Sequence, residues 1–307
     1  MWKFGITRVE QLQWESEHVL ATRDQRISIT LYDKVGTLEN GNAIAERILF
    51  DFADERRAYK RTYCDRFRDF DEEILSFLVN SHPINSIHDV GVSDGRTALD
   101  FFERVSQCFP DLEYVASDIS GSLLVVEDGN LTVTLNQGGQ ILEILYHPFV
   151  FNIAVKDSRL HYPINSLACL LTRLTLVPLL LRKLSRKKIA PREIFLFAPA
   201  VLKKAAETRR FRVAQHNILH PLSGRFDAVR AMNILNPTYF TTEEFETALC
   251  NVHRALNPNG VLITGSNEDA GSIVNGAVYI KKLNGFERLR TSGSGSPVDQ
   301  IICSLRI

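Results

Sequence analysis

The sequence predicts an α/β protein built on a doubly wound, mostly parallel sheet of seven strands. From residue 86 onward, short apolar runs of strand length alternate with patterns of helical period. This alternation is typical of a parallel sheet that is covered by helices on both faces. The first apolar run also ends in a turn containing glycine, within IHDVGVSDGRT at 87–97, and a helical pattern follows it directly.

The composition excludes several classes of protein. The 307 residues contain 36 basic and 36 acidic side chains, so no global charge attracts nucleic acid. The cysteines are single and form no CxxC pair, which favours reduced thiols over disulfides or a metal site; they are Cys64, Cys108, Cys169, Cys250 and Cys303. The first residues carry regular charges and no apolar core of a signal peptide, so a cytoplasmic protein is expected.

Residues 1–83 are expected to form an N-terminal leader and helical region. Up to residue 40 no long period is visible, and only an irregular leader with short elements is predicted. Between 42 and 78, apolar residues recur at helical spacing, which predicts one broken helix or two consecutive helices packed on the main domain.

The main domain is expected to comprise 84–120 and 191–307. Strands are predicted at 86–90 and 112–117 and in RFRVAQHNI, FDAVRAMNI and GVLITGS, with helices at 97–109 and in APAVLKKAAE. Thr241 and Glu244 match a capping box at the start of a further helix. The tail predicts two closing strands, AVYIKKLNGFERLR and DQIICSLRI, around the loop SGSGSP.

An insert at 121–190 interrupts this alternation. Its first part has DG and GG turn signals between β-rich runs, which predicts an antiparallel meander. The segment 164–181 has Arg173 as its only charge, and Arg182, Lys183, Arg186, Lys187 and Lys188 follow it. A single membrane span is excluded because it would separate strands of one sheet. Three alternatives remain for 164–188: a buried or lid helix, a homodimer interface, and a helix in peripheral contact with anionic lipid.

The glycine turn does not match the dinucleotide fingerprint GxGxxG, so a nicotinamide enzyme is disfavoured. It resembles motif I of class I S-adenosylmethionine-dependent methyltransferases, in which an acidic residue precedes glycines at alternate positions. Asp89, Gly91, Ser93 and Gly95 match this motif with serine in place of one glycine. The resemblance implies a Rossmann-like fold that binds S-adenosylmethionine and releases S-adenosylhomocysteine.

The same resemblance implies the second half of the site. Asp118 ends the second strand, where a carboxylate accepts the hydrogen bonds of a ribose diol, and Ile119 would face the adenine. Residues 211–267 look most like the chemotaxis-receptor carboxyl methyltransferase branch. That likeness implies Asn217 and Ile218 near the adenine, and Met232 and Asn233 near the methionyl end. Alternatively, Asp118 and the two asparagines only stabilise their own turns.

The resemblance thus implies an S-adenosylmethionine-dependent methyltransferase whose insert shapes access for a small-molecule or lipid-linked acceptor. A carboxylate acceptor needs no base, whereas a hydroxyl needs one. No catalytic residue is assigned; the polar candidates at strand ends are His220, Asn236, Tyr239, Glu268 and Asp269. His147, His161 and His216 lack the spacing of metal ligands, and no metal is expected. The alternatives are a non-catalytic Rossmann-like module with a degenerate site and a nucleotide-sugar or nicotinamide oxidoreductase.

Overall fold

A computed structural model describes residues 2–13, 26–38, 40–52, 60, 62–153, 170–171, 174–175, 177–187, 190–236, 240–267 and 273–307. The chain forms two compact units, each made of two separate segments. Unit 1 comprises Met1–Arg61 and Ser122–Leu196, and unit 2 comprises Thr62–Gly121 and Phe197–Ile307. This division differs from the one expected from the sequence, because the N-terminal leader joins the insert in one unit.

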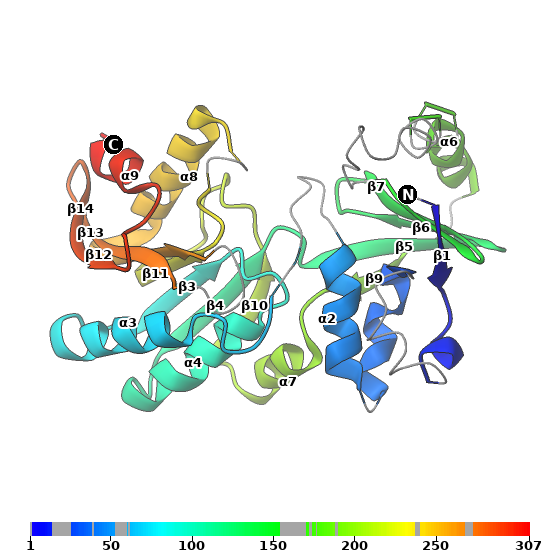
Figure 1. Cartoon of the computed structure of the whole chain (residues 1–307). Helices are drawn as coiled ribbons and strands as arrows, with labels where there is room; N and C mark the ends of the chain where they lie inside the picture. The colour runs from blue at the N-terminus through cyan, green and yellow to red at the C-terminus, as the bar shows by residue number, and fades with distance from the viewer. Residues whose placement is uncertain are drawn as a thin grey trace. The chain divides into compact units, whose positions relative to one another are not determined.

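Unit 2 contains a seven-stranded sheet in the order β10-β4-β3-β11-β12-β13-β14 (Figure 1). Neighbours from β10 to β12 pair in parallel, and the last two strands add antiparallel pairs. The strands are β3 (Ser86–Val90), β4 (Glu113–Asp118), β10 (Phe211–Gln215), β11 (Phe226–Met232), β12 (Leu256–Ser266), β13 (Asn275–Lys282) and β14 (Gly285–Ser292). The predicted doubly wound, mostly parallel sheet is confirmed.

Helices cover both faces of this sheet, each with one apolar side. On one face, α3 (Arg68–Ser81), α4 (Arg96–Cys108) and α7 (Pro199–Glu207) contribute Ile74, Phe101 and Val201 to one core cluster. On the other, α8 (Thr242–Ala255) and α9 (Asp299–Ser304) contribute Leu249 and Ile302 to a second cluster. The predicted capping box at Thr241 and Glu244 is present at the start of α8.

The prediction of a strand in DQIICSLRI is wrong, because Asp299–Ser304 forms α9. The segment is rich in β-branched and apolar residues, which favoured a strand. However, Val298 and Ile302 lie four residues apart and are both buried against unit 2. That spacing places both side chains on one side of a helix, and burial of this side decides the conformation.

Unit 1 is a second sheet, in the order β2-β1-β8-β7-β6-β5-β9. The predicted antiparallel meander is confirmed in β5 (Ser122–Asp128), β6 (Leu131–Leu135), β7 (Ile141–Tyr146) and β8 (Phe149–Asn152). β9 (Arg192–Phe195) pairs with β5, and β1 (Trp2–Ile6) and β2 (Arg26–Ile27) extend the other edge. The short elements expected in the leader are present as β1 and β2, and the pairing of β1 with β8 adds them to this sheet, which the sequence did not indicate.

The 3₁₀ helix η1 (Ile29–Thr37) and α2 (Gly41–Asp51) pack on one face of this sheet. The two predicted consecutive helices therefore belong to different units: Ile44 and Ile48 of α2 lie in the unit 1 core, whereas α3 lies in unit 2.

The other face of the unit 1 sheet is covered by α6 (Val177–Lys187), which packs on it through Leu180. α6 covers the last part of the predicted segment 164–188, in which 164–169, 172–173, 176 and 188 lie outside the described residues. Pro178 suits the first turn of α6, where no amide donor is needed. Within the described ranges, no helix is both long and apolar enough to cross a bilayer.

Candidate functional site

The candidate site lies at the carboxyl edge of the parallel strands in unit 2. The chain runs from β3 to β4 and β10 on one side, and then crosses to β11 and β12 on the other side of β3. The strand order therefore reverses between β3 and β11. In sheets of this kind, ligands bind outside the carboxyl ends of the strands at such a reversal. The glycine turn follows β3 at this point.

The turn at 91–95 has a left-handed backbone at alternate residues. The φ angles are +74° at Gly91, +60° at Ser93 and +82° at Gly95. Ser93 thus adopts the conformation for which the motif supplies a glycine, although a side chain there costs about 1–2 kcal/mol. The Gly91 and Val92 amides donate to the Ser117 carbonyl, at 2.7 and 3.1 Å, which fixes the turn against β4.

Substitution of Gly91 by alanine is expected to destabilise the protein by about 2–4 kcal/mol. A Cβ atom would lie 2.5 Å from Cδ1 and 2.9 Å from Cβ of Ile234, in addition to the unfavourable φ. Gly139→Ala is the matched control, since φ there is +79° but nothing lies within 4 Å of the added atom. In urea unfolding, Gly139→Ala should lose much less free energy of unfolding than Gly91→Ala. Equal losses for the two variants would contradict the close contact with Ile234.

Asp118, at the end of β4, connects the two halves of the predicted site. Its Oδ2 accepts a hydrogen bond of 2.7 Å from the Ser93 amide in the glycine turn, and its Oδ1 accepts one of 3.0 Å from the Ser120 amide. Asp118 therefore stabilises its own turn, as the alternative expected, and also holds the glycine turn.

Asp89 uses its carboxylate inside the protein. Its Oδ2 accepts from the Tyr114 hydroxyl at 2.6 Å and from Arg230 Nη1 at 2.7 Å, and Arg230 Nη2 donates to Asp71 Oδ1 at 2.8 Å. All four residues are buried. Burial raises the pKa of Asp71 to about 6, although the Arg230 guanidinium opposes the shift. We refer to Asp71, Asp89, Tyr114 and Arg230 as the buried ionic network; it anchors α3, β3, β4 and β11 beneath the glycine turn.

The residues at the ends of β10 and β11 are held by their own hydrogen bonds. Asn217 Oδ1 accepts from the Leu219 amide at 3.1 Å, which is the local turn that the alternative expected. Asn233, with φ +57°, exchanges two hydrogen bonds of 3.0 Å with Asn267. The Ile218 and Met232 side chains are buried in core clusters, so these residues offer mainly their backbone to a ligand. Ile119 is half-buried, and its carbonyl accepts from Gln215 Nε2 at 2.9 Å. The assignment of these residues to a cofactor stays a prediction.

The structure adds Arg66 to the carboxyl edge, which the sequence did not indicate. Its Nε donates to Asn267 Oδ1 at 3.0 Å, and its guanidinium lies 5.6 Å from the Tyr63 ring centre and 5.3 Å from that of Phe67. This segment precedes α3 and contains no motif, so only the tertiary structure brings a cation to the end of β12. Such a cation suits a ligand with a negatively charged end.

The proposed acceptor-side candidates are only partly described. His220 is exposed, and its amide donates to the Asn217 carbonyl, while the Asn236 amide donates to the Ile234 carbonyl. Tyr239, Glu268 and Asp269 lie outside the described residues, as does His161. No catalytic role follows for either described residue.

His88 lies on β3 next to the site and was not singled out by any sequence pattern. Its Nε2 and the Ser117 hydroxyl are 2.8 Å apart, and its ring centre lies 5.7 Å from that of His216. Burial, with a smaller contribution from His216, lowers the pKa of His88 to about 3. The ring is therefore neutral near pH 7 and serves packing and hydrogen bonding rather than proton transfer.

The lowered pKa of His88 predicts acid sensitivity. Between its unfolded value of about 6.5 and its folded value of about 3, the unfolded state binds the additional proton, so stability falls as pH falls. The free energy of unfolding of the wild type, relative to His88→Gln, should decrease by about 1.4 kcal/mol from pH 6 to pH 5. Urea titrations at both pH values measure this difference, and a constant difference would show that His88 is not shifted.

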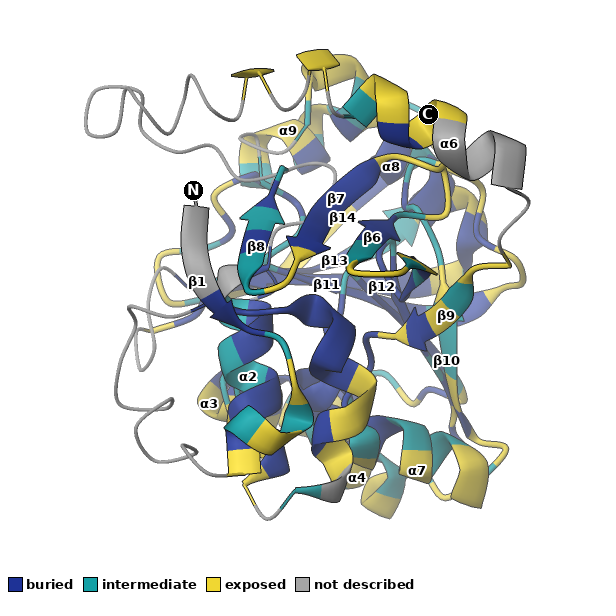
Figure 2. Cartoon of the chain, turned by 90° about the vertical axis from the view of Figure 1, so that its right-hand side faces the viewer, coloured by how far each residue is buried: buried dark blue, intermediate teal, exposed yellow. Residues whose placement is uncertain are grey.

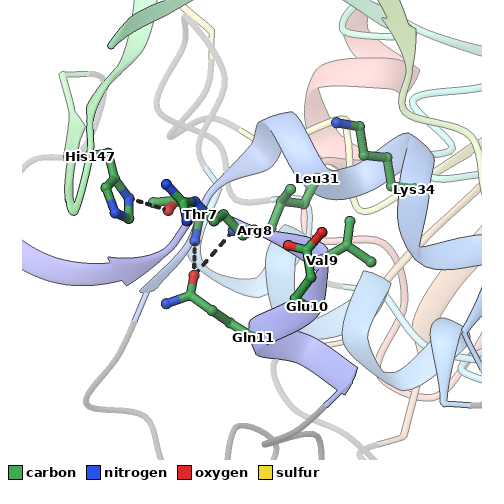
Figure 3. Close-up of a pocket in the computed structure, with 8 residues that line it drawn as sticks. All are labelled: Thr7, Arg8, Val9, Glu10, Gln11, Leu31, Lys34 and His147. Atoms are coloured by element: carbon green, nitrogen blue, oxygen red, sulfur yellow. Dashed lines mark hydrogen bonds between the residues drawn. The ribbon is translucent and has the colours of Figure 1, made fainter.

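Unit 1 contains a separate cavity of about 660 Å³ (Figure 3). Its lining combines cationic, acidic and apolar side chains: Thr7, Arg8, Val9, Glu10, Gln11, Leu31, Lys34 and His147. Thr7 Oγ1 and His147 Nδ1 are 2.8 Å apart, and Gln11 Oε1 accepts from the Thr7 and Arg8 amides at 3.0 and 3.1 Å. The mixed charge suits a polar small molecule and does not select one class.

Comparison with known proteins gives structural likeness only. No protein-family model matches the chain, and no curated protein matches it. The N-methyltransferase NodS from Bradyrhizobium japonicum, solved with S-adenosyl-L-homocysteine, shares 13% identity over 67% of this chain and 65% of its own, with a TM-score of 0.33. CalS10 from Micromonospora echinaspora, an amino pentose methyltransferase solved with bound SAM, shares 12% over 70% of this chain and 63% of its own, with a TM-score of 0.32.

An O-methyltransferase family protein from Burkholderia thailandensis shares 10% identity over 83% of this chain and 51% of its own, with a TM-score of 0.32. The matched parts therefore span less than two thirds of the length of all three proteins. All three are described as methyltransferases. Because the structural similarity is low, the function must be argued from the site itself.

Proposed function

We propose that unit 2 binds S-adenosylmethionine and transfers its methyl group to an acceptor, as an O- or N-methyltransferase. One observation carries the proposal: the Asp118 carboxylate at the end of β4 lies 2.7 Å from the Ser93 amide of the left-handed glycine turn after β3. A strand-end carboxylate and a turn of close-approach backbone thus meet at the reversal of strand order. These are the two halves that an adenosyl ligand requires.

The described residues suit the parts of this cofactor. The Asp118 carboxylate, at the end of β4, would accept hydrogen bonds from the ribose hydroxyls. Gly91 and Gly95 let the turn keep its left-handed backbone, since a Cβ would lie 2.5 Å from Ile234 at Gly91 and 2.9 Å from Val201 at Gly95. Arg66, at Asn267, supplies a cation for the carboxylate of the methionine moiety. The buried ionic network keeps the turn in place from below.

When bound, S-adenosylmethionine would supply a methyl group on a sulfonium sulfur; the acceptor lone pair would form the new bond to carbon, and the carbon–sulfur electron pair would go to sulfur. The protein needs mainly to position the acceptor and to exclude water. A carboxylate acceptor needs no base. A hydroxyl, which is neutral, and an ammonium group, which is a cation, must each lose a proton to a base. No described residue is assigned the role of this base.

A second function, a non-catalytic Rossmann-like module, has one observation in its favour. Ser93 replaces a motif glycine, and the Asp118, Asn217 and Asn233 side chains all make hydrogen bonds within the protein. A degenerate site could keep these bonds for stability alone. Cofactor binding can be measured without a methyl acceptor, and this measurement distinguishes the methyltransferase from the non-catalytic module.

Isothermal titration calorimetry of the full-length protein with S-adenosylmethionine, S-adenosylhomocysteine and NAD(P) tests the proposal. Saturable binding of the first two ligands, with no binding of NAD(P), is the expected result. Binding of NAD(P) alone would support an oxidoreductase, and no heat with any ligand would support the non-catalytic module. Transfer of a labelled methyl group to small carboxylates, amines and lipid extracts would then identify the acceptor.

A further inference from the structure

The apolar segment of unit 1 leaves several leucines exposed. Their side chains are between 39% and 66% accessible, and they fall within one short stretch of the chain: Leu170, Leu171, Leu174, Leu179 and Leu181. Single exposed leucines are common on protein surfaces, but a concentration of them marks an interaction site. We call these five residues the leucine patch.

The leucine patch is separate from the core of unit 1, because another residue, Leu180, already packs α6 on the sheet. Leu180 of α6 is 5% exposed and packs with Val133, Ile141 and Ile144 of the sheet. Leu179 and Leu181 flank Leu180 in α6, which Figure 2 labels, and they are 61% and 39% exposed. The side of α6 that packs on the sheet is thus filled, and the leucine patch is additional.

The three leucines before α6 share one side of a helical turn. Thr175 Oγ1 donates to the Leu171 carbonyl at 2.7 Å, which is the four-residue spacing of such a turn. Leu170 and Leu171 precede Leu174 by four and three residues, so all three project to the same side. Leu170, Leu171 and Leu174 are exposed, as are Leu179 and Leu181 of α6.

The charge of this segment is entirely positive. No acidic residue occurs from 158 through 192, while Arg182, Lys183, Arg186, Lys187 and Lys188 follow the patch directly. The whole chain has a formal net charge of 0, so this cluster is a local concentration. Arg182 is exposed. Near an anionic membrane, each basic residue contributes about 1 kcal/mol of attraction.

We propose that the leucine patch and the basic residues 182–188 bind unit 1 to the surface of an anionic lipid membrane. Exposed leucines insert into the acyl boundary while the basic residues meet the lipid headgroups, as in interfacial helices. A symmetric interface with a second copy is less favoured, because the same surface of each copy would meet in it. The basic cluster of one copy would then lie near that of the other, and like charges repel.

The test is co-sedimentation of the full-length protein with vesicles of phosphatidylcholine alone or with phosphatidylglycerol added. The wild type should bind the anionic vesicles, and high salt should weaken the binding because it screens the charges. Leu174→Glu/Leu179→Glu and Arg182→Glu/Arg186→Glu should each reduce binding at least about tenfold. Leu283→Glu is the matched control, since Leu283 is 89% exposed in unit 2 and should bind as the wild type does.

Three results would overturn the proposal: no binding of the wild type, equal binding to both kinds of vesicle, or wild-type binding by either double variant. Size-exclusion chromatography with light scattering detects the alternative occupant, because a dimer that Leu174→Glu/Leu179→Glu dissociates would assign the patch to a second copy. Unfolding curves check that the variants fold. Calorimetry with S-adenosylmethionine keeps this test separate from the proposed function, since these variants should retain whatever cofactor affinity the wild type has.

Discussion

Asp118→Ala is expected to weaken the binding of S-adenosylmethionine on the order of 100-fold. Hydrogen bonds to a charged group contribute about 1.5–3 kcal/mol each, and each 1.4 kcal/mol corresponds to a factor of ten in affinity. The substitution also leaves the Ser93 and Ser120 amides without their carboxylate acceptor, so the glycine turn loses a support. Asp118→Asn keeps one acceptor oxygen, so its affinity for S-adenosylmethionine should fall only about tenfold.

Calorimetric titration of both variants measures the effect. Glu113→Ala is the control, because Glu113 begins the same strand, is exposed and pairs only with exposed Arg212 among the ion pairs of the described residues. Its affinity should equal that of the wild type. If Asp118→Ala bound the cofactor as tightly as the wild type does, Asp118 would serve only its turn, and the proposed ribose contact would be rejected.

Arg230→Ala is expected to lower the free energy of unfolding by about 3–5 kcal/mol. Removing one partner of a buried ion pair leaves an uncompensated charge, which is far more damaging than the loss of an exposed pair. Here two carboxylates, Asp71 and Asp89, would lose their common cation. The guanidinium also lies over the rings of Phe67 and Phe101, at 5.4 and 4.8 Å from their centres, so packing is lost as well.

Urea unfolding near neutral pH measures this loss. Arg212→Ala removes an exposed ion pair and should change stability by less than about 1 kcal/mol, so it is the matched control. Adding Asp71→Asn to an Arg230→Met background should recover part of the loss, since one buried negative charge is removed. An Arg230→Ala effect as small as that of the control would contradict a structural role for the network.

The pH dependence of the Arg230 variant follows from the same carboxyls. Burial raises the pKa of Asp71 to about 6 even beside the guanidinium, and it also raises the pKa of Asp89. Without the cation both pKa values should rise further above their unfolded values. Asp71 and Asp89 in the variant then bind protons more readily in the folded state than in the unfolded state. The difference in free energy of unfolding between the wild type and Arg230→Ala should therefore shrink as pH falls from 8 to 5.

The glycine turn and Asp118 could be predicted because their signals are local. The β3 prediction at 86–90 matches the structure, and α4 and β4 differ from their predicted limits by one residue. A strand followed by a turn with small residues and a helix is encoded within a few consecutive residues. The parallel arrangement then places the ends of β3 and β4 side by side, so Ser93 and Asp118 meet.

The buried ionic network and Arg66 could not be predicted in the same way. Asp71, Asp89 and Arg230 are separated by up to 159 residues, and each has an ordinary sequence context. Their pairing depends on α3 packing over β3 and β11, which is a long-range event. Asp89 shows the difference most clearly, because the motif indicated a cofactor residue, whereas its carboxylate is buried with Arg230 and Tyr114.

The sequence by itself determined the alternating α/β pattern of unit 2, the meander of unit 1 and the glycine turn with its strand-end aspartate. These features depend on periodicity and on turn chemistry, which act over a few residues. Only the tertiary structure decided that β1 joins β8, that α2 and α3 belong to different units, and that the final segment is a helix. Those outcomes depend on which apolar surfaces and strand edges meet, and distant parts of the chain supply these partners.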